Sequence, residues 1–498
     1  MEFFEYEMND VSSLTRLFWS DPQSRIDYEA FGDVVVFDST YRVNKYNLPF
    51  IPFVGVNHHG STVIFACAIV ADEKTSTYEW ILRQFLNCMG QKHPKSLITD
   101  GDNAMRRAIT SVMPNSDHRL CTWHIEQNMG RHLHQDMIAD FRVLVMHPLI
   151  QMSRRKWDEF KFNHKVSEDN KWLMRMYNLR KKWAAAYTKG RFFLGMKSNQ
   201  RSESLNSKLH RYLDRKLTLV LLVEHYEHCL SRMRHREAKL DAKSSQSVSF
   251  TASDASEFEK DASHVFTPAA FKKVKLEICK SMDWEVIDSI EEDSLVRYVI
   301  SRKENSEKMK ILSCTYVDSS LQSITCPCQK LECECIPCDH IFAVLHFLKA
   351  DAIPLCCIMR RWTMKAKNAF YSDRYGETYH WSDQMERYRK LRSVGNEVLF
   401  RCSMTEENTD KVLSMLVNLE LDETCGSVGN EELQYSHVLA QSKRTDIERS
   451  ATVHDPDQIM PKGAPTKRIR GFMEKRVIHC GYCHAPGHTI RSCPLYLR

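Results

Sequence analysis

Long hydrophobic runs are absent from this chain of 498 residues. The longest uninterrupted apolar run, Val63 to Ala71, holds nine residues, far short of the ~20 that a membrane-spanning helix needs. The first seven residues, Met-Glu-Phe-Phe-Glu-Tyr-Glu, are acidic, whereas a secretory signal peptide is basic and then apolar. We therefore expect a soluble protein that is not secreted and has no membrane partner.

A large excess of one charge and an internal repeat are also absent. The 70 basic and 64 acidic side chains leave a net charge of +6, which permits nucleic-acid binding without arguing for it. An apolar fraction of 43% and a charged fraction of 27% are typical of globular proteins. They exclude collagen, a fully disordered chain and a coiled coil, and the length predicts roughly three domains.

Cysteine, by contrast, is abundant, with 18 residues. A protein that is not secreted occupies a reducing compartment, where disulfide frameworks are rare. Clustered cysteines in such a protein more often bind a metal ion.

The first 125 residues carry strand and helix patterns in a definite order. Three strand-like runs come first, and helices and strands then alternate. This order predicts an α/β fold, a mixed sheet with helices on its faces. The predicted strands are 33–37, 51–56, 62–70, 96–99 and 119–123, and the predicted helices are 76–90 and 102–113.

The remaining chain divides by composition. Residues 125–200 show only helical spacing and predict an all-helical insertion, and the helical pattern resumes over 201–240. We interpret the Ser-, Asp- and Lys-rich stretch 243–263 as a linker. The predicted units are 1–240, a linker and helical segment at 241–281, strand pairs with a cysteine cluster at 282–350, a helical segment at 351–420, a disordered polar and basic tail at 421–476, and a last cysteine-rich module at 477–498.

Two carboxylates end predicted strands that we expect to be neighbours in the sheet. Asp38 follows the first strand and Asp100 the fourth, and Glu203 at a helix start is a candidate third acid. Carboxylates with substrate phosphate oxygens form the oxygen cage that Mg²⁺ or Mn²⁺ prefers, and two such ions can promote in-line phosphoryl transfer. The alternative is capping, since acids often occupy these positions for that reason alone.

Four motifs occur in series: Phe37-Asp-Ser-Thr-Tyr41, Ile98-Thr-Asp-Gly-Asp-Asn-Ala104, Cys121-Thr-Trp-His124 and Arg201-Ser-Glu-Ser-Leu-Asn-Ser207. They resemble the Mutator-like (MULE) transposase domain, and most of all the plant far-red impaired response and far-red elongated hypocotyl group of domesticated transposases. The resemblance covers about residues 1–350 and implies an RNase H-like fold with a DDE triad and a helical insertion before the glutamate.

The resemblance also implies residue roles. The triad becomes Asp38, Asp100 and Glu203, with Asp102 a nearby acid that could be mistaken for the second member. Cys121 and His124 match the C-x-x-H motif of the family; the alternative is a buried cysteine and a hydrogen-bonded histidine. All three acids are present, yet a domesticated protein can keep them for folding or metal-dependent DNA binding, so we lean against an enzyme.

A cysteine cluster follows the transposase-like region. Three thiolates and one imidazole suit tetrahedral Zn²⁺ in a closed structural site. The C-x-C…C-x-H spacing resembles a SWIM zinc finger, and we expect the helix after the histidine to pack over the site. Cys333 and Cys335 lie in the gap and could compete, but we interpret them as packing thiols. The predicted ligands are Cys326, Cys328, Cys338 and His340.

A second zinc site is predicted near residue 490. The spacing C-x2-C-x4-H-x4-C is that of a zinc knuckle, in which the metal supplies the folding energy that so short a segment lacks. Such knuckles contact single-stranded nucleic acid or protein, and both alternatives stay open. The predicted ligands are Cys480, Cys483, His488 and Cys493.

A basic cluster precedes the knuckle. Positive charge in such a segment is typical of a nuclear-import signal or an arm that contacts phosphates, and the alternative is a solvated linker. Its residues include Lys467, Arg468, Arg470, Lys475 and Arg476.

Three functions remain. We expect first a transposase-derived nuclear regulator of transcription that binds DNA and two structural Zn²⁺ ions, with a role in light-responsive development implied by the resemblance only. The second is an active DDE transposase using two Mg²⁺ or Mn²⁺ ions. The third is a scaffold that pairs with related family members and binds no DNA. Longer members begin with a zinc-binding DNA-recognition domain that we expect this chain to lack. None of the three uses a small-molecule substrate.

Overall fold

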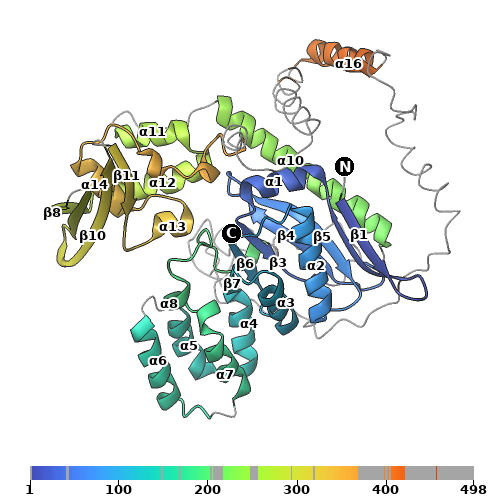
Figure 1. The fold of residues 1–498 in the computed structure, drawn as a ribbon, viewed down its shortest axis with the longest axis horizontal. Helices are drawn as coiled ribbons and strands as arrows, with labels where there is room; N and C mark the ends of the chain where they lie inside the picture. The colour runs from blue at the N-terminus through green and yellow to red at the C-terminus, as the bar shows by residue number, and fades with distance from the viewer. Residues whose placement is uncertain are drawn as a thin grey trace, which may run out of the picture.

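The computed structural model describes residues 3–40, 44–146, 150–167, 170–201, 205, 217–246, 256–292, 294–317, 320–367, 398, 402, 405–420 and 456. Two β-sheets and a separate group of helices make up this part of the chain (Figure 1). No helix within these ranges is long and apolar enough to span a membrane.

The first sheet has seven strands in the order β1-β2-β5-β4-β3-β6-β7. β3 is parallel to β6 and β6 to β7, whereas the other neighbouring pairs are antiparallel. The mixed α/β sheet is therefore confirmed, with the predicted neighbours β3 and β6 side by side. The strands are β1 (Phe3–Met8), β2 (Leu14–Ser20), β3 (Val34–Phe37), β4 (Phe50–Val56), β5 (Thr62–Val70), β6 (Ser96–Thr99) and β7 (Asp117–Leu120).

Helices cover both faces of this sheet. Side chains alternate between the two faces of a strand, so Val35 and Phe37 of β3 join one hydrophobic core while Val34 and Val36 join another. The first core lies under α1 (Pro22–Phe31), α2 (Thr75–Cys88) and α3 (Asn103–Val112), and the second lies under α10 (Leu219–Gln246).

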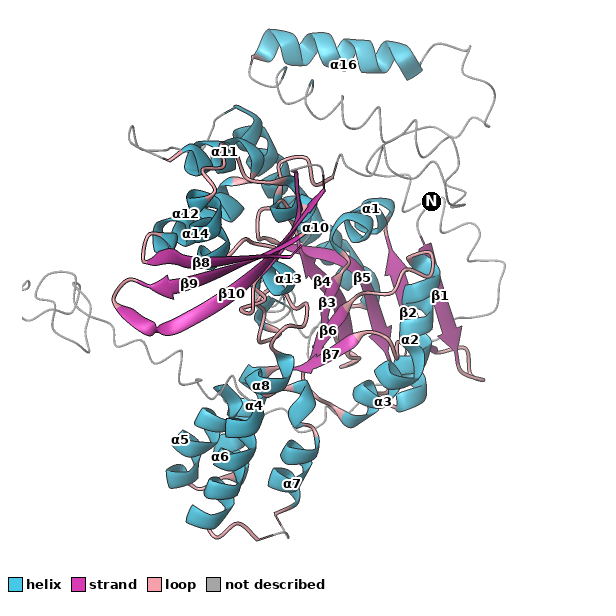
Figure 2. Ribbon diagram, turned by 60° about the vertical axis from the view of Figure 1, so that its left-hand side comes forward, coloured by secondary structure: helices cyan, strands magenta, loops and turns pink. Residues whose placement is uncertain are grey.

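A helical region with its own core follows β7, as predicted. Phe141, Trp157 and Trp183 are buried at its centre. Figure 2 shows these helices below the end of the sheet that carries β6 and β7. They are α4 (Thr122–His132), α5 (Gln135–Met146), α6 (Ile150–Asn163), α7 (Lys171–Asn178), the 3-10 turn η1 (Arg180–Lys182) and α8 (Ala185–Thr188).

The second sheet is antiparallel, in the order β11-β10-β9-β8. Its core, with Ile300 and Phe342, is continuous with the α10 face of the first sheet. The elements are α11 (Glu257–Val265), α12 (Pro268–Ser281), β8 (Trp284–Glu292), β9 (Leu295–Arg302), β10 (Asn305–Val317), β11 (Ser320–Thr325), α13 (Lys330–Glu334), α14 (Asp339–Phe347), η2 (Leu355–Cys357), η3 (Arg360–Trp362) and, farther on, α16 (Glu406–Glu420).

The structure differs from the sequence interpretation in three places. The sequence pattern does not predict β1 and β2, because their half-exposed side chains give no clean apolar alternation. Helix α11 lies inside the stretch interpreted as a linker, where Phe258 and Ala262 are a buried minority in a polar sequence. The fifth strand ends at Leu120, because Cys121 is already the N-cap of α4.

Candidate functional site

Two aspartates lie at the carboxyl ends of neighbouring parallel strands, a place we call the acid edge. Asp38 directly follows β3 and Asp100 directly follows β6. The strand register pairs Val36 with Ile98. Continuing that register sets the two aspartates opposite each other, on strands about 4.8 Å apart. Glu203, the predicted third acid, lies outside the described residues.

Asp100 sits in an environment that disfavours its charge. Burial raises the pKa of Asp100 to about 6, and the carboxylates of Asp102 and Glu73 add to the rise. Backbone N–H groups oppose it, among them the Asp102 N–H, which donates to Asp100 Oδ1 at 2.9 Å. A divalent cation would stabilise the ionised form of such a carboxylate.

Glu73 is a further acid at this edge that the sequence analysis missed. The Tyr78 hydroxyl donates to Glu73 Oε1 at 2.9 Å and lies 2.9 Å from Ser39 Oγ, next to Asp38. Glu73 lies in the turn before α2. From the sequence alone, an acid in this position would be interpreted as a helix-capping residue. The position of Glu73 near Asp100 becomes apparent only in the structure, where this turn lies beside the acid edge.

Asn199 connects the C-x-x-H motif to the acid edge. It is fully buried, and its Nδ2 donates to Asp38 Oδ2 at 2.7 Å. Its Oδ1 accepts from Cys121 Sγ at 3.0 Å, and its Nδ2 lies 3.4 Å from His124 Nδ1. Burial lowers the pKa of His124 to about 4, so the ring is neutral at pH 7 and Nδ1, when it is the unprotonated ring nitrogen, can accept a hydrogen bond from this amide. Cys121 and His124 therefore contact the amide that holds Asp38.

A sequence signal for Asn199 did exist. It ends the helical region four residues before Glu203. If Glu203 is to reach the acid edge as the third acid, the residues just before it must approach that edge as well.

The helical region brings positive charge to the same place. Residues 125–200 hold 15 Lys and Arg against 7 Asp and Glu, a net charge of +8, whereas the whole chain carries +6. Arg175 of α7 donates from Nη2 to the Gly101 carbonyl at 2.9 Å, one residue beyond Asp100. A polyanion approaching the acid edge would come close to Arg175 and to a region of net positive charge.

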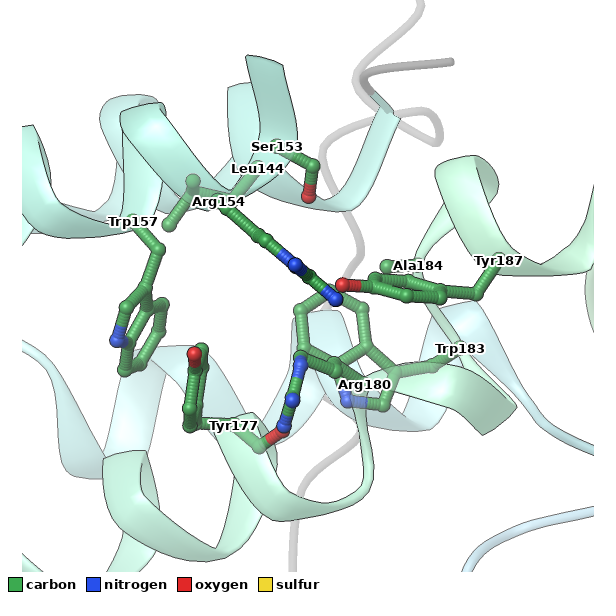
Figure 3. A pocket seen from close by; sticks show the side chains of 9 residues that line it. All are labelled: Leu144, Ser153, Arg154, Trp157, Tyr177, Arg180, Trp183, Ala184 and Tyr187. Atoms are coloured by element: carbon green, nitrogen blue, oxygen red, sulfur yellow. The ribbon is translucent and has the colours of Figure 1, made fainter. Parts of the chain in front are cut away.

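A small pocket inside the helical region gathers two arginines among four aromatic rings (Figure 3). The Arg180 guanidinium lies 4.0 Å from the Tyr177 ring centroid. Burial raises the pKa of Tyr187, but hydrogen bonds from Arg154 and Arg180 outweigh it and lower the pKa. With a free volume of only ≈ 10 Å³, the pocket has room for about one water molecule, so we regard it as packing.

Four metal-binding side chains converge beside the second sheet. Their ligand atoms all lie within 4.8 Å of one another. Cys326 follows the last residue of β11, whereas Cys338 is the N-cap of α14 and His340 lies in its first turn. Three thiols and an imidazole at these separations suit tetrahedral zinc. This Cys3His cluster, which could bind a zinc ion, consists of Cys326, Cys328, Cys338 and His340.

The surroundings of the Cys3His cluster favour a bound metal. Hydrogen bonds from two neighbouring thiols hold the pKa of Cys328 well below its usual range, which favours the thiolate that zinc requires. Asp339 Oδ1 lies 2.9 Å from His340 Nδ1 and Trp284 Nε1 donates to Asp339 Oδ2 at 3.0 Å. Carboxylates in this position orient histidine ligands. Lys310 Nζ lies 2.7 Å from His340 Nε2, a contact that a metal at this nitrogen would replace.

The other predicted metal-site residues lie elsewhere. Cys333 and Cys335 are not members of the Cys3His cluster; Cys335 packs in the hydrophobic core, and the Cys333 carbonyl accepts from the Leu194 N–H at 2.9 Å. The predicted knuckle and basic cluster fall outside the described residues: Cys480, Cys483, His488, Cys493, Lys467, Arg468, Arg470, Lys475 and Arg476.

Residues 34–128 match the family model of the MULE transposase domain. Three Arabidopsis thaliana proteins are similar over much of the chain. Protein FAR1-RELATED SEQUENCE 5 is 28% identical over 466 residues, which cover 89% of this chain and 58% of the relative. Protein FAR-RED IMPAIRED RESPONSE 1 is 28% identical over 488 residues, covering 95% and 56%, and Protein FAR1-RELATED SEQUENCE 4 is 31% identical over 374 residues, covering 74% and 50%. The chain thus spans little more than half the length of these curated relatives.

Proposed function

Since the chain belongs to the FAR1-related sequence family and carries a MULE transposase domain, we propose that it is a transposase-derived nuclear protein that binds zinc and DNA and regulates transcription. The observation that carries the DNA-binding part is the +8 helical region next to the acid edge. A role in light-responsive development is supported only by the name of the relative FAR-RED IMPAIRED RESPONSE 1.

We assign residues 1–240 an RNase H-like fold. The strands β5-β4-β3 form an antiparallel meander that leads into the parallel strands β6 and β7. Asp38 and Asp100 end two of these strands at one edge, which supports their assignment with Glu203 to a DDE triad that holds Mg²⁺ or Mn²⁺. Residues 282–350 are assigned to a SWIM zinc finger on the strength of the Cys3His cluster.

Neutralising exposed lysines of the helical region should weaken the binding of DNA to this region. We expect the triple variant Lys171→Gln, Lys181→Gln, Lys189→Gln to bind DNA more weakly at 100 mM salt. Each lost phosphate contact should also flatten the plot of log affinity against log salt by about 0.9. Fluorescence anisotropy on duplex DNA over a salt series measures both quantities.

A matched triple variant removes the same charge elsewhere. Lys272, Lys303 and Lys349 are exposed and lie outside the helical region, and their change to Gln should leave the slope as in the wild type. Equal losses in both triple variants would show that DNA responds only to total charge, and would count against a binding surface on the helical region.

An active DDE transposase is the second candidate. It is favoured by the two aspartates at the acid edge and by the raised pKa of Asp100, which are the features of a divalent-metal site. Strand cleavage of DNA with terminal inverted repeats in the presence of Mn²⁺ would support this candidate. Binding of the same DNA without cleavage would support the regulator.

A further inference from the structure

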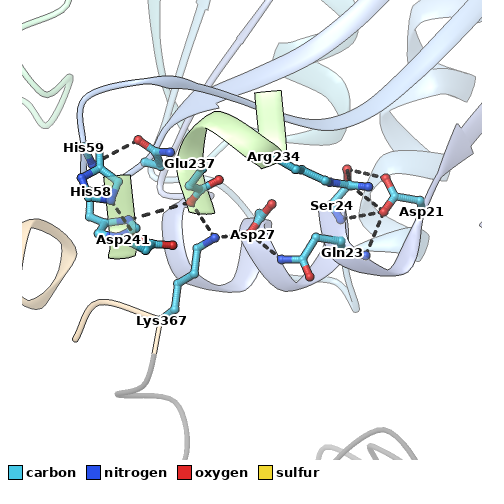
Figure 4. Close-up of polar contacts among 11 residues, drawn as sticks. Asp21, Gln23, Ser24, Asp27, His58, His59, Arg234, Glu237, Asp241 and Lys367 are labelled. Atoms are coloured by element: carbon cyan, nitrogen blue, oxygen red, sulfur yellow. Dashed lines mark hydrogen bonds and ion pairs between the residues drawn. The ribbon is translucent and has the colours of Figure 1, made fainter. Parts of the chain in front are cut away.

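Two histidines and an aspartate meet at the end of the first sheet opposite the acid edge. β4 is antiparallel to β3, so the turn after Val56 lies where β3 begins. That turn carries His58 and His59, and both point toward Asp241 of α10, about 180 residues later in the chain (Figure 4). Nothing in the acid edge or the Cys3His cluster uses these three residues.

The ligand atoms of this cluster are already close together. Asp241 Oδ1 lies 2.8 Å from His58 Nε2 and 2.7 Å from His59 Nε2. The two histidines are 2% and 8% exposed, so the chain holds both imidazoles in place. We propose that His58, His59 and Asp241 bind a divalent metal ion, zinc or a similar ion that accepts two imidazoles and a carboxylate.

Ligand spacing requires only a small adjustment. Zinc forms bonds of about 2.0–2.1 Å with such ligands, which separates tetrahedral ligand atoms by roughly 3.3 Å. The present separations from Asp241 Oδ1 would have to widen by about half an ångström. The Asp241 side chain is half-exposed, so it has room to move by this amount.

The hydrogen-bonded alternative leaves a buried atom without a partner. If His58 donates its Nε2 proton to Asp241, its Nδ1 becomes an acceptor, and no donor among the described residues reaches that buried atom. The carboxylate Glu237 Oε1 lies 4.0 Å from this Nδ1 and would repel its lone pair. A metal on Nε2 would instead put the proton on Nδ1, facing Glu237, which is the usual carboxylate partner of a histidine ligand.

Formal charges in the cluster also call for a cation. Lys367 Nζ lies 2.6 Å from Glu237 Oε1 and 3.1 Å from Asp27 Oδ1, so one ammonium neutralises one of these two carboxylates. Asp27 and Glu237 are buried, and together with the half-exposed Asp241 they place three carboxylates near the two imidazoles. A divalent ion at the imidazoles would offset part of this negative charge.

The bound metal would tie together parts of the fold that are distant in sequence. Thr267 Oγ1 donates to the His58 carbonyl at 2.6 Å, and Arg361 Nη2 donates to the Val56 carbonyl at 2.7 Å. Arg201, two residues before Glu203, donates to the Gly60 carbonyl. The metal would therefore hold the turn between β4 and β5 against α10. This turn lies where the first sheet meets the part of the chain that carries the Cys3His cluster.

The test is the metal content of the full chain, refolded with Zn²⁺ and measured by atomic spectroscopy after gel filtration. We expect Asp241→Asn and His59→Asn each to hold one zinc equivalent fewer than the wild type. The control Glu224→Gln changes an exposed acid on the same helix and should keep the wild-type content. Asp241→Asn replaces a half-exposed side chain and should fold even if His59→Asn does not.

Co²⁺ as a probe identifies the ligands. The absorption lost in Asp241→Asn should show d–d bands without sulfur-to-cobalt charge transfer, whereas Cys338→Ser should lose the sulfur bands. The two losses are independent, so failure of one assignment leaves the other intact. Wild-type zinc content in both Asp241→Asn and His59→Asn would overturn the proposal and leave the three residues as a hydrogen-bonded triad.

Discussion

Replacing Cys338 with Ser is expected to release one zinc ion per chain and to unfold the region of the second sheet, residues 282–350. Cys338 is buried at the N-cap position of α14, where its side chain makes no capping hydrogen bond, so its loss acts by opening the Cys3His cluster. In zinc-finger peptides the metal contributes about 10–16 kcal/mol of apparent free energy. Whole domains are stable by only about 5–15 kcal/mol, so we do not expect this region to stay folded.

Zinc content and amide hydrogen exchange measure the two effects together. The matched control is Cys333→Ser, which removes a nearby thiol outside the Cys3His cluster. It should keep its zinc and the protection of β9 and β10. A Cys338→Ser protein with wild-type zinc and wild-type protection would refute the ligand assignment.

Changing Asp100 to Asn is expected to have two effects of opposite sign. Stabilisation of the chain by Mn²⁺ should be abolished, because one of the two strand-end aspartates that we assign to the metal is lost. The metal-free protein should become more stable at pH 7, because a half-buried and unfavourable charge is removed. Thermal denaturation with and without Mn²⁺ measures both effects.

The pH dependence follows from the raised pKa of Asp100. Its carboxyl group titrates near 3.8 when unfolded and at about 6 when folded, so the folded state holds the proton more tightly. Its stabilising effect is complete below pH 3.8 and is lost as the pH rises through 6, a change of about 3 kcal/mol. Mn²⁺ binding should run the opposite way and weaken as the pH falls below 6, because the protonated carboxyl is a poor ligand.

Asp102→Asn is the matched control at this edge. Asp102 accepts from the Met105 N–H at 3.0 Å as the N-cap of α3, and Asn caps helices about as well as Asp. This variant should keep its Mn²⁺ response. If Asp102→Asn lost that response while Asp100→Asn kept it, the second acid of the triad would be Asp102.

Local patterns in the sequence predicted the centre of the fold. β3 and β6 are short, fully buried runs that are each followed by an aspartate, and α2 and α3 bury apolar side chains at helical spacing. Strands β1 and β2 were not predicted because their side chains are largely exposed or half-exposed. Helix α11 was not predicted because a few buried apolar residues cannot outweigh a polar segment. Whether such segments form strands or helices depends on how distant elements bury them, and the local sequence pattern does not contain that information.

The same distinction, between local patterns and contacts made by distant segments, separates the sites that the sequence predicts from those that it misses. The Cys3His cluster could be predicted because its ligands lie within fifteen residues at a recognisable spacing. The contact of Asn199 with Asp38 and the pairing of His58 with Asp241 could not be predicted from local patterns, because each joins residues that are more than 150 positions apart in the chain. From the sequence alone, His58 and His59 are predicted only to form part of a turn.

The most direct test of DNA-binding regulation is a binding profile of the purified, zinc-loaded chain on fragmented genomic DNA. We expect one recurring sequence, enriched near gene starts, with weaker recovery for the triple lysine variant of the helical region. Enrichment at terminal inverted repeats would instead favour the transposase. Recovery no higher than the input DNA would contradict DNA binding by this chain and leave the interaction scaffold as its function.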